Sequence, residues 1–342
     1  MKTVLIFGAG GFIGGHLAKK LTNEGHKVIC ADIKFNEYWD HPDRLPSYWE
    51  NNNLDGYFHR FYLLDLRERH NVNWLVGHFK PDEIYQLAAD MGGAGYIFSG
   101  DHDADVMHNS ITINLNTLKA AQEFLPLTKI FYSSSACIYP EHNQLDPDNP
   151  NCEESSAYPA NPDSEYGWEK LFSERIYHAY MRNYGLNIRI ARFHNIFGPE
   201  GSWNNGKEKS PAAICRKVAM AEPDGEVEIW GTGKQTRSYL YIGECLEGIE
   251  RLMESDCREV INLGSEEMIS INDLAYMVAD IAGYNVHLKH IDGPLGVMGR
   301  RSQNDFIEKC LNWKPSAPLR TGMTKTFQWI KEQIHDANNS LG

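Results

Sequence analysis

The chain has no long hydrophobic run. None of its apolar stretches approaches the roughly 20 residues that a membrane-spanning helix needs, so we expect no membrane span. The amino terminus, Met1-Lys2-Thr3, leads directly into a short strand-like segment, without the pattern of a signal peptide. These absences favour a cytoplasmic protein with no membrane partner.

Cysteine is sparse and shows no motif. The sequence has seven cysteines, an odd number, and no Cys-x-x-Cys pair. We therefore expect neither a zinc site nor a redox dithiol, and no metal in the functional site. Most of these cysteines are interpreted as small buried side chains in a reducing compartment.

Positive charge is also in deficit. The 33 Lys and Arg residues face 46 Asp and Glu residues, which gives a net charge of -13. Without an overall positive field, a general nucleic-acid or membrane-surface binder is not expected. A local cluster of Arg and Lys is still enough to bind an anionic small molecule such as a diphosphate. The hydrophobic content of 42% is that of an ordinary globular protein.

Strand-like and helix-like segments alternate over the first part of the chain. Strands are predicted at 4–7, 27–31, 58–62, 83–87, 130–133 and 187–191, with long helices at 105–124 and 165–184. This alternation predicts an α/β fold with a doubly wound parallel sheet of the Rossmann type. We assign 1–192 to a dinucleotide-binding domain, with an excursion at 34–57.

Residues 193–342 have shorter segments and frequent turns, with helices predicted at 211–221, 243–255, 271–282 and 324–335. We interpret them mainly as a smaller mixed α/β lobe that binds the substrate, from which some segments return to the first domain. The excursion at 34–57 is aromatic and polar without a clear period. A surface loop, a lid and a subunit contact are all compatible with it.

A glycine-rich turn follows the first predicted strand. Gly8, Gly11 and Gly14 are spaced G-x-x-G-x-x-G, with Gly10 between them, and Asp32 ends the next strand. This is the dinucleotide fingerprint, in which a diphosphate lies at the helix amino terminus. An acidic residue in the place of Asp32 binds the ribose hydroxyls and repels a 2′-phosphate, which favours NAD over NADP. The residues predicted to bind the cofactor are Gly8, Gly10, Gly11, Phe12, Ile13, Gly14, Asp32, Asp65, Leu66 and Lys170.

A serine run and a Tyr-x-x-x-Lys pair predict a site that oxidises an alcohol. Ser135 closes the fifth predicted strand, and Tyr166 and Lys170 are four residues apart on a predicted helix. A nearby ammonium group is expected to lower the pKa of the tyrosine, which would then act as a base near neutral pH. The same region contains Cys137, and Lys209 follows later in the chain.

The second half of the chain contributes polar and cationic candidates. Asn195 follows the sixth predicted strand, and Arg237 and Arg300 lie in two arginine-containing segments suited to a diphosphate. His194 is interpreted as a structural histidine. Small residues after the fourth strand, including Gly92, suit the close approach of a ligand to the backbone.

Together these residues resemble the extended short-chain dehydrogenase/reductase family. Within that family the chain is most similar to enzymes that invert C3 and C5 of GDP-mannose. The motifs are GAGGFIG at 8–14, LAADMGG at 87–93, SSACIYPE at 134–141, the Tyr-Lys pair at 166–170, RFHNIFGP at 192–199, EKSPAAICRK at 208–217, QTRS at 235–238 and GVMGRRS at 296–302. Ala94, Trp168 and the long excursion depart from the pattern of those enzymes.

The resemblance implies an NAD-dependent isomerase that acts as a homodimer on a GDP-sugar. Transient oxidation at C4 acidifies C3 and C5, protons exchange there, and C4 is reduced again, which gives products of the GDP-L-galactose type. The resemblance assigns the alcohol chemistry to Ser135, Tyr166 and Lys170, and the acid–base pair to Cys137 and Lys209. Substrate contacts are assigned to Gly92, Ser135, Cys137, Tyr166, Asn195, Lys209, Lys217, Gln235, Arg237 and Arg300.

Two other functions remain open at this point. A C4-only epimerase or dehydrogenase of another nucleotide sugar would need the Ser/Tyr/Lys set but would make Cys137 a packing residue. A non-catalytic dinucleotide sensor is not expected to have that set intact. Related 4,6-dehydratases have Asp and Glu where this chain has Ala136 and Cys137, which argues against dehydration.

Overall fold

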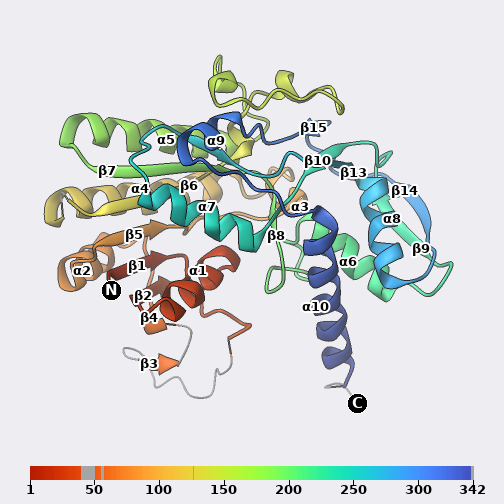
Figure 1. Ribbon diagram of the computed structural model, residues 1–342, viewed down its shortest axis with the longest axis horizontal. Coiled ribbons are helices and arrows are strands. Elements are labelled where there is room, and N and C mark those ends of the chain that lie inside the picture. Colours follow the sequence, from red (N-terminus) through yellow and green to blue (C-terminus); the bar gives the residue numbers. More distant parts are fainter. Residues whose placement is uncertain (40–50, 55–57, 126, 340–342) are drawn as a thin grey trace.

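A large sheet with helices on both faces forms the body of the protein (Figure 1). The computed structural model describes residues 1–39, 51–54, 58–125 and 127–339. The eight strands run in the order β12-β7-β6-β5-β1-β2-β4-β3. Their bounds are β1 (Thr3–Phe7), β2 (Lys27–Asp32), β3 (Asn51–Leu54), β4 (Phe58–Leu63), β5 (Glu83–Gln86), β6 (Lys129–Ser135), β7 (Asn187–Phe193) and β12 (Ile261–Leu263).

The seven strands from β12 to β4 are parallel to one another, as the alternating sequence pattern predicts, and the predicted fold class is confirmed. Two features were not predicted. β3 is antiparallel to β4 at the edge of the sheet. The late strand β12 extends the opposite edge by pairing with β7. Neither short segment has a distinctive pattern of its own.

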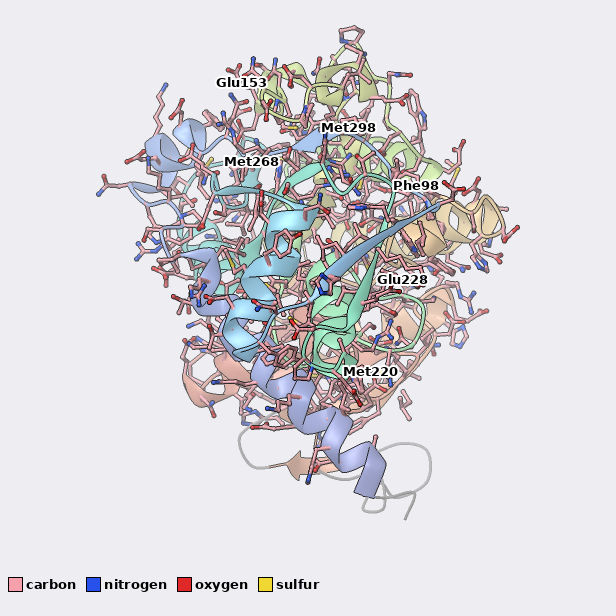
Figure 2. The ribbon with its side chains drawn as sticks, turned by 90° about the vertical axis from the view of Figure 1, so that its right-hand side faces the viewer. Phe98, Glu153, Met220, Glu228, Met268 and Met298 are labelled. Atoms are coloured by element: carbon pink, nitrogen blue, oxygen red, sulfur yellow. The ribbon has the colours of Figure 1, made fainter. Side chains whose placement is uncertain are left out.

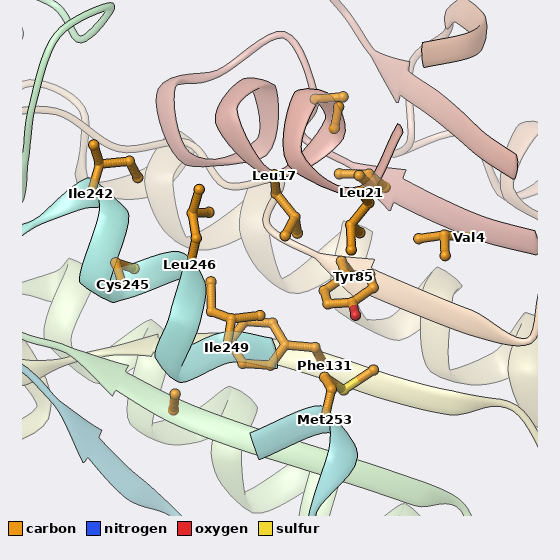
Figure 3. Close-up of a cluster of buried hydrophobic side chains, with 14 of the residues drawn as sticks. Val4, Leu17, Leu21, Tyr85, Phe131, Ile242, Cys245, Leu246, Ile249 and Met253 are labelled. Atoms are coloured by element: carbon orange, nitrogen blue, oxygen red, sulfur yellow. The ribbon is translucent and has the colours of Figure 1, made fainter. Parts of the chain in front are cut away.

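The two faces of the sheet are covered by different helices. Buried side chains of α1 (Phe12–Asn23) and α7 (Ile242–Glu254) join one core cluster with β1, β2 and β6. Figure 3 shows this cluster, with Leu17 of α1 on the side of Leu246 and Ile249 of α7, and Leu21 of α1 next to Tyr85 of β5. The second cluster joins the sheet to α2 (Arg69–Phe79), α4 (Asp103–Phe124) and α5 (Glu165–Tyr184). The sheet is therefore buried on both faces, which explains its continuous apolar strands.

A smaller lobe lies beside the carboxyl ends of the strands (Figure 1), and it faces the viewer in Figure 2. Its core joins α6 (Ser210–Met220), α8 (Ile271–Ala282) and α10 (Leu319–Asn339). The small sheets pair β8 (Ile196–Phe197) with β11 (Leu240–Tyr241), β9 (Glu226–Trp230) with β14 (His287–Ile291), and β10 (Thr236–Ser238) with β13 (Met268–Ser270) and β15 (Gly299–Arg300). The remaining helices are α3 (Ala94–Ile97) and α9 (Asp305–Leu311), with 3-10 turns η1 (Ala136–Ile138), η2 (Glu141–Gln144) and η3 (Glu154–Ala157).

Only part of the predicted excursion at 34–57 belongs to the described structure, since 40–50 and 55–57 lie outside it. Where it begins, Trp39 is buried against Phe35, Phe58 and Phe61. Tyr38 contacts Trp329 on α10 with ring centroids 5.0 Å apart. These aromatic contacts tie the start of the excursion to the body of the protein.

The helices predicted from the sequence are present with small shifts at their ends, and the carboxyl-terminal helix is longer than predicted, at 319–339. Among the described residues, no helix combines the length and the apolarity that crossing a bilayer requires.

Replacing Ile249 on α7 should test how strongly this helix stabilises the sheet. Ile249 is fully buried in the first core cluster, so Ile249→Ala should lower the free energy of unfolding by about 3 kcal/mol. Urea denaturation measures this loss. Leu127→Ala, at a side chain that is 91% exposed, is the control and should change stability by less than about 0.5 kcal/mol. Equal effects of the two substitutions would contradict this packing.

Candidate active site

Two adjoining cavities lie at the carboxyl ends of the strands in the large sheet. The first has a volume of about 600 Å³, and the second, toward the smaller lobe, about 360 Å³. Both are lined by Met91, Gly92, Ser135, Tyr166 and Lys209. The first cavity extends to the glycine turn between β1 and α1, where parallel α/β sheets bind ligands.

The glycine turn requires backbone positions without a Cβ atom. Gly8 has a φ of 87°, and a Cβ there would lie 2.6 Å from the amide nitrogen of Ala88. A Cβ on Gly14 would lie 2.2 Å from the carbonyl oxygen of Gly8. The amino end of α1 has neither a side-chain cap nor an acidic residue in its first turn. Its N–H groups and helix dipole therefore suit a diphosphate, which is what NAD presents to this turn.

Asp32 lies at the end of β2 and lines the first cavity. Its carboxylate accepts hydrogen bonds from the backbone N–H of Gly10 at 2.9 Å and of Lys34 at 3.2 Å. Burial raises the pKa of Asp32, and these two N–H groups oppose that shift. The carboxylate is thus fixed at the wall of the cavity, as a ribose-binding acid requires.

All residues predicted to bind the cofactor line the first cavity except Gly10, whose role in the structure is to hold Asp32. Asp65 and Leu66 also line it, and the carboxylate of Asp65 is bound by Arg67, which lowers the pKa of Asp65. The residues present therefore fit NAD. Sequence reasoning missed the lining residues Ile33 and Asn109, which belong to no motif.

Ser135, Tyr166 and Lys170 come together at the junction of the cavities. Ser135 ends β6 and lines both cavities, as does Tyr166. Ser164 caps α5 by accepting a hydrogen bond from the N–H of Gly167 at 3.3 Å, and this fixes the first turn of the helix that carries Tyr166. The ammonium of Lys170 donates to the carbonyl oxygen of Ser133 at 3.1 Å.

The pKa of Tyr166 differs from the sequence-based expectation. Burial raises the pKa of Tyr166, against smaller opposing effects of Ser135 and Arg300. The predicted lowering by Lys170 is therefore wrong. The reason is geometric, because the Lys170 nitrogen lies 5.7 Å from the ring of Tyr166 and points to a backbone carbonyl. Burial also lowers the pKa of Lys170 itself.

Cys137 lies in the turn η1 and faces the second cavity. Its backbone N–H donates to the hydroxyl of Ser135 at 3.2 Å, so the turn ties thiol and hydroxyl together. A guanidinium nitrogen of Arg300 donates to the sulfur of Cys137 at 3.1 Å. Since a guanidinium only donates, the sulfur acts as acceptor, and this contact is strongest when the sulfur is anionic.

Arg300 is itself held by two residues that the sequence analysis did not single out. It donates to the side-chain oxygen of Gln144 at 2.6 Å and to the carboxylate of Asp163 at 3.0 Å. Both partners come from segments that precede the smaller lobe in the sequence. The ion pair between Arg300 and Asp163 is buried. No short motif connects them to residue 300, so the sequence carried no signal for this cluster.

Lys209 lies just before α6 and lines both cavities. Burial lowers the pKa of Lys209, and Cys137 is the first group that opposes this shift. The two candidate acid–base residues therefore share one environment. Backbone pairing of the Gly93 N–H with the carbonyl of Lys207 at 3.0 Å fixes the loop that carries Lys209.

The remaining predicted substrate contacts also line the second cavity, namely Gly92, Asn195, Lys217, Gln235, Arg237 and Arg300. Several are already bonded within the protein. Arg237 donates to backbone carbonyls, including that of Val297 at 2.6 Å, and burial lowers its pKa to about 10. Lys217 donates to the carbonyl of Glu228 at 2.7 Å. His194 lies outside the cavities, where it is fully buried and bonded to Asn262, in line with a structural role.

Sequence reasoning missed the apolar part of the second cavity. Phe98, Trp230, Pro294 and Leu295 line it. The segments around positions 98 and 295 are far apart in the sequence and have no motif, so only the fold brings them together.

The fold and the site are those of an enzyme that uses a dinucleotide cofactor. The chain belongs to the NAD dependent epimerase/dehydratase family, whose model matches residues 4–264. Its cofactor is accordingly NAD.

Among named relatives, the chain is 44% identical to GDP-mannose 3,5-epimerase of Arabidopsis thaliana over 331 residues, which are 97% of this chain and 82% of the relative. GDP-mannose 3,5-epimerase 1 of Oryza sativa subsp. indica is also 44% identical with the same coverage. The fold is similar to that of UDP-glucose 4-epimerase from Thermotoga maritima, with a TM-score of 0.81, 22% identity and coverage of 97% of this chain and 99% of that one.

The position of Asp32 predicts a preference for NAD over NADP. A 2′-phosphate would bring negative charge to the cavity wall that Asp32 forms, so NADP should bind at least roughly tenfold more weakly than NAD. Asp32→Ser should weaken NAD binding and reduce this ratio. Titration of cofactor-free protein with both dinucleotides measures it. An unchanged ratio in the variant would show that Asp32 does not select the cofactor.

Proposed function

We propose that this protein is an NAD-dependent epimerase that inverts C3 and C5 of GDP-mannose or a close GDP-sugar through a transient C4 ketone. The observation that carries the proposal is the position of Cys137 and Lys209, which line one cavity with Tyr166. Relatives 44% identical to the chain are GDP-mannose 3,5-epimerases.

The first step is oxidation of the sugar at C4. The glycine turn and Asp32 would hold NAD, which would supply the hydride acceptor and donor for C4 and a positively charged ring in its oxidised form. Tyr166 removes the proton of the C4 hydroxyl, which Ser135 orients from the end of β6. Because burial raises the pKa of Tyr166, the phenolate depends on positive charge around the bound sugar.

Proton exchange at carbon follows from the ketone. A C4 carbonyl acidifies the hydrogens on C3 and C5, and inversion needs one group to remove a proton and another to deliver one to the opposite face. Cys137 is the proposed base, with Arg300 at 3.1 Å to stabilise its anionic sulfur. Lys209 is the proposed acid, since burial lowers the pKa of Lys209 toward the working range of a proton donor.

The rest of the nucleotide sugar is proposed to occupy the second cavity. Asn195, Lys217, Gln235, Arg237 and Arg300 would contact the sugar and diphosphate from the lobe assigned to 193–342, and the domain assigned to 1–192 would hold NAD. All five line that cavity. On binding, Arg237 would exchange some of its contacts with backbone carbonyls for phosphate oxygens.

Incubation with GDP-mannose in deuterated water tests the reaction. We expect epimerised product with deuterium at C3 and C5, detected by NMR. A C4-only epimerase or dehydrogenase would convert a nucleotide sugar without deuterium at these carbons. Turnover of GDP-mannose without exchange would therefore overturn the proposal.

Cys137→Ser tests the proposed base within the same assay. It should reduce deuterium exchange by at least roughly 100-fold, while the nicotinamide absorbance change that reports C4 oxidation persists. Cys257→Ser, at a partly exposed cysteine outside both cavities, is the matched control and should exchange normally. Normal epimerisation by the Cys137 variant would remove Cys137 from the mechanism.

A cytoplasmic homodimer is the proposed working form. The support for the dimer is three exposed apolar side chains on the neighbouring helices α4 and α5, with Leu115 and Trp168 each 40% and Phe172 46% exposed. Burial of such side chains stabilises association.

Phe172→Asp should convert a dimer into monomers, because it places a charge among these apolar groups. Light scattering on an eluting sample gives the mass of each form. Tyr276→Asp, at a side chain 52% exposed on α8, is the control and should stay dimeric. A monomeric wild-type protein would contradict the proposed assembly.

A further inference from the structure

Glu169 is a fully buried carboxylate that the proposed reaction does not use. It lies on α5 next to Lys170 and has no exposed surface. One carboxylate oxygen accepts hydrogen bonds from Ser173 at 2.7 Å and from Asn114 at 3.3 Å. The other has no hydrogen-bond partner among the described residues, and it lies 3.9 Å from the ammonium nitrogen of Lys170. The carboxylate is therefore anchored by one oxygen and directs the other to Lys170.

Lys170 in turn lies where an ammonium group is costly. It is 2% exposed, and its nitrogen donates to the carbonyl of Ser133 and lies 5.1 Å from the centre of the Tyr132 ring. A buried charge with so few partners requires a counter-charge. The groups around it that carry or gain negative charge are Glu169 and Glu174 on α5 and Cys137 on η1.

Two of these three groups are already engaged. Glu174 forms a buried ion pair with Arg192 at 2.9 Å and also binds the hydroxyl of Ser134. Cys137 accepts from Arg300. Among the described residues, Glu169 forms an ion pair with Lys170 and with no other lysine or arginine. The geometry thus leaves Glu169 as the counter-charge for Lys170.

We infer that Glu169 is a positioning residue, the counter-ion that keeps the buried Lys170 protonated and thereby supports Tyr166 as the base at C4. This inference rests on the roles proposed for Tyr166 and Lys170. Without Glu169, the proton that makes Lys170 an ammonium is lost more easily, and the site shifts to a neutral amine beside a neutral phenol. That form cannot remove the proton of the C4 hydroxyl.

The direction of the pKa shifts agrees with this arrangement. Burial raises the pKa of Glu169, and Lys170 is the first group that opposes this shift. Burial lowers the pKa of Lys170, and Glu169 is the first group that opposes it. Each charge is therefore the main stabiliser of the other in a site that disfavours both.

A double-mutant cycle in urea tests the ion pair without any enzymatic activity. Glu169→Gln and Lys170→Met should each lower the urea midpoint, because each leaves the other charge buried and unpaired. The double variant should lose clearly less than the sum of the two single losses. Additive losses would show that the two side chains do not interact, and would overturn the inference.

The pH dependence of turnover tests the catalytic consequence. In Glu169→Gln, Lys170 should lose its proton at lower pH, so the alkaline limb of the kcat/KM profile should move to lower pH. On that limb the rate should fall at least roughly tenfold below the wild type. Ser173→Ala is the matched control, since it removes a hydrogen bond to Glu169 but keeps the charge, and its limb should stay in place. A Glu169→Gln profile that is merely scaled down, with its shape unchanged, would overturn the inference.

The two experiments separate the possible failures. If the wild type does not epimerise GDP-mannose, the proposed function fails, while the urea cycle still reports on the pair. If the wild type exchanges deuterium as proposed but the cycle is additive or the alkaline limb does not move, the function stands and the role of Glu169 is wrong.

Discussion

The contact between Arg300 and Cys137 is the interaction on which the site depends. It joins a residue of the late strand β15 to the turn that follows β6, across 163 positions of the chain. Gln144 and Asp163 fix the guanidinium from the other side. The smaller lobe is therefore tied to the large sheet at the point where the thiol faces the cavity. Loss of this buried cluster would separate the proposed base from the group that stabilises its anion.

Desolvation is the second constraint, and it acts on Tyr166, Lys170 and Lys209. Burial raises the pKa of Tyr166 and lowers the pKa values of Lys170 and Lys209. A site of this kind disfavours isolated charge, so each charged form needs a partner of opposite sign. Arg300 is the positively charged partner of Cys137, and Glu169 is the negatively charged partner of Lys170. The protonation states of the reacting groups therefore depend on these two pairs, whose electrostatic attraction is strengthened by burial.

The sequence predicted what is local in the chain. The glycine turn, Asp32 and the Tyr166–Lys170 pair follow from spacings within one β-α unit or one helix turn, and the alternating apolar segments predict the parallel sheet. The partners of Arg300 could not be predicted, because Gln144 and Asp163 reach it only through the tertiary fold. The same holds for the pKa of Tyr166, since four residues of spacing place Lys170 on the correct face but do not say where its ammonium points.

The rate at which iodoacetamide alkylates Cys137 measures the central contact most directly. Alkylation requires the thiolate, so if Arg300 stabilises that anion, Arg300→Gln should react several-fold more slowly than the wild type at neutral pH, even though the smaller side chain opens the cavity. Peptide mass spectrometry identifies the modified cysteine, and circular dichroism verifies the fold. An equal or faster rate in the variant would contradict the account.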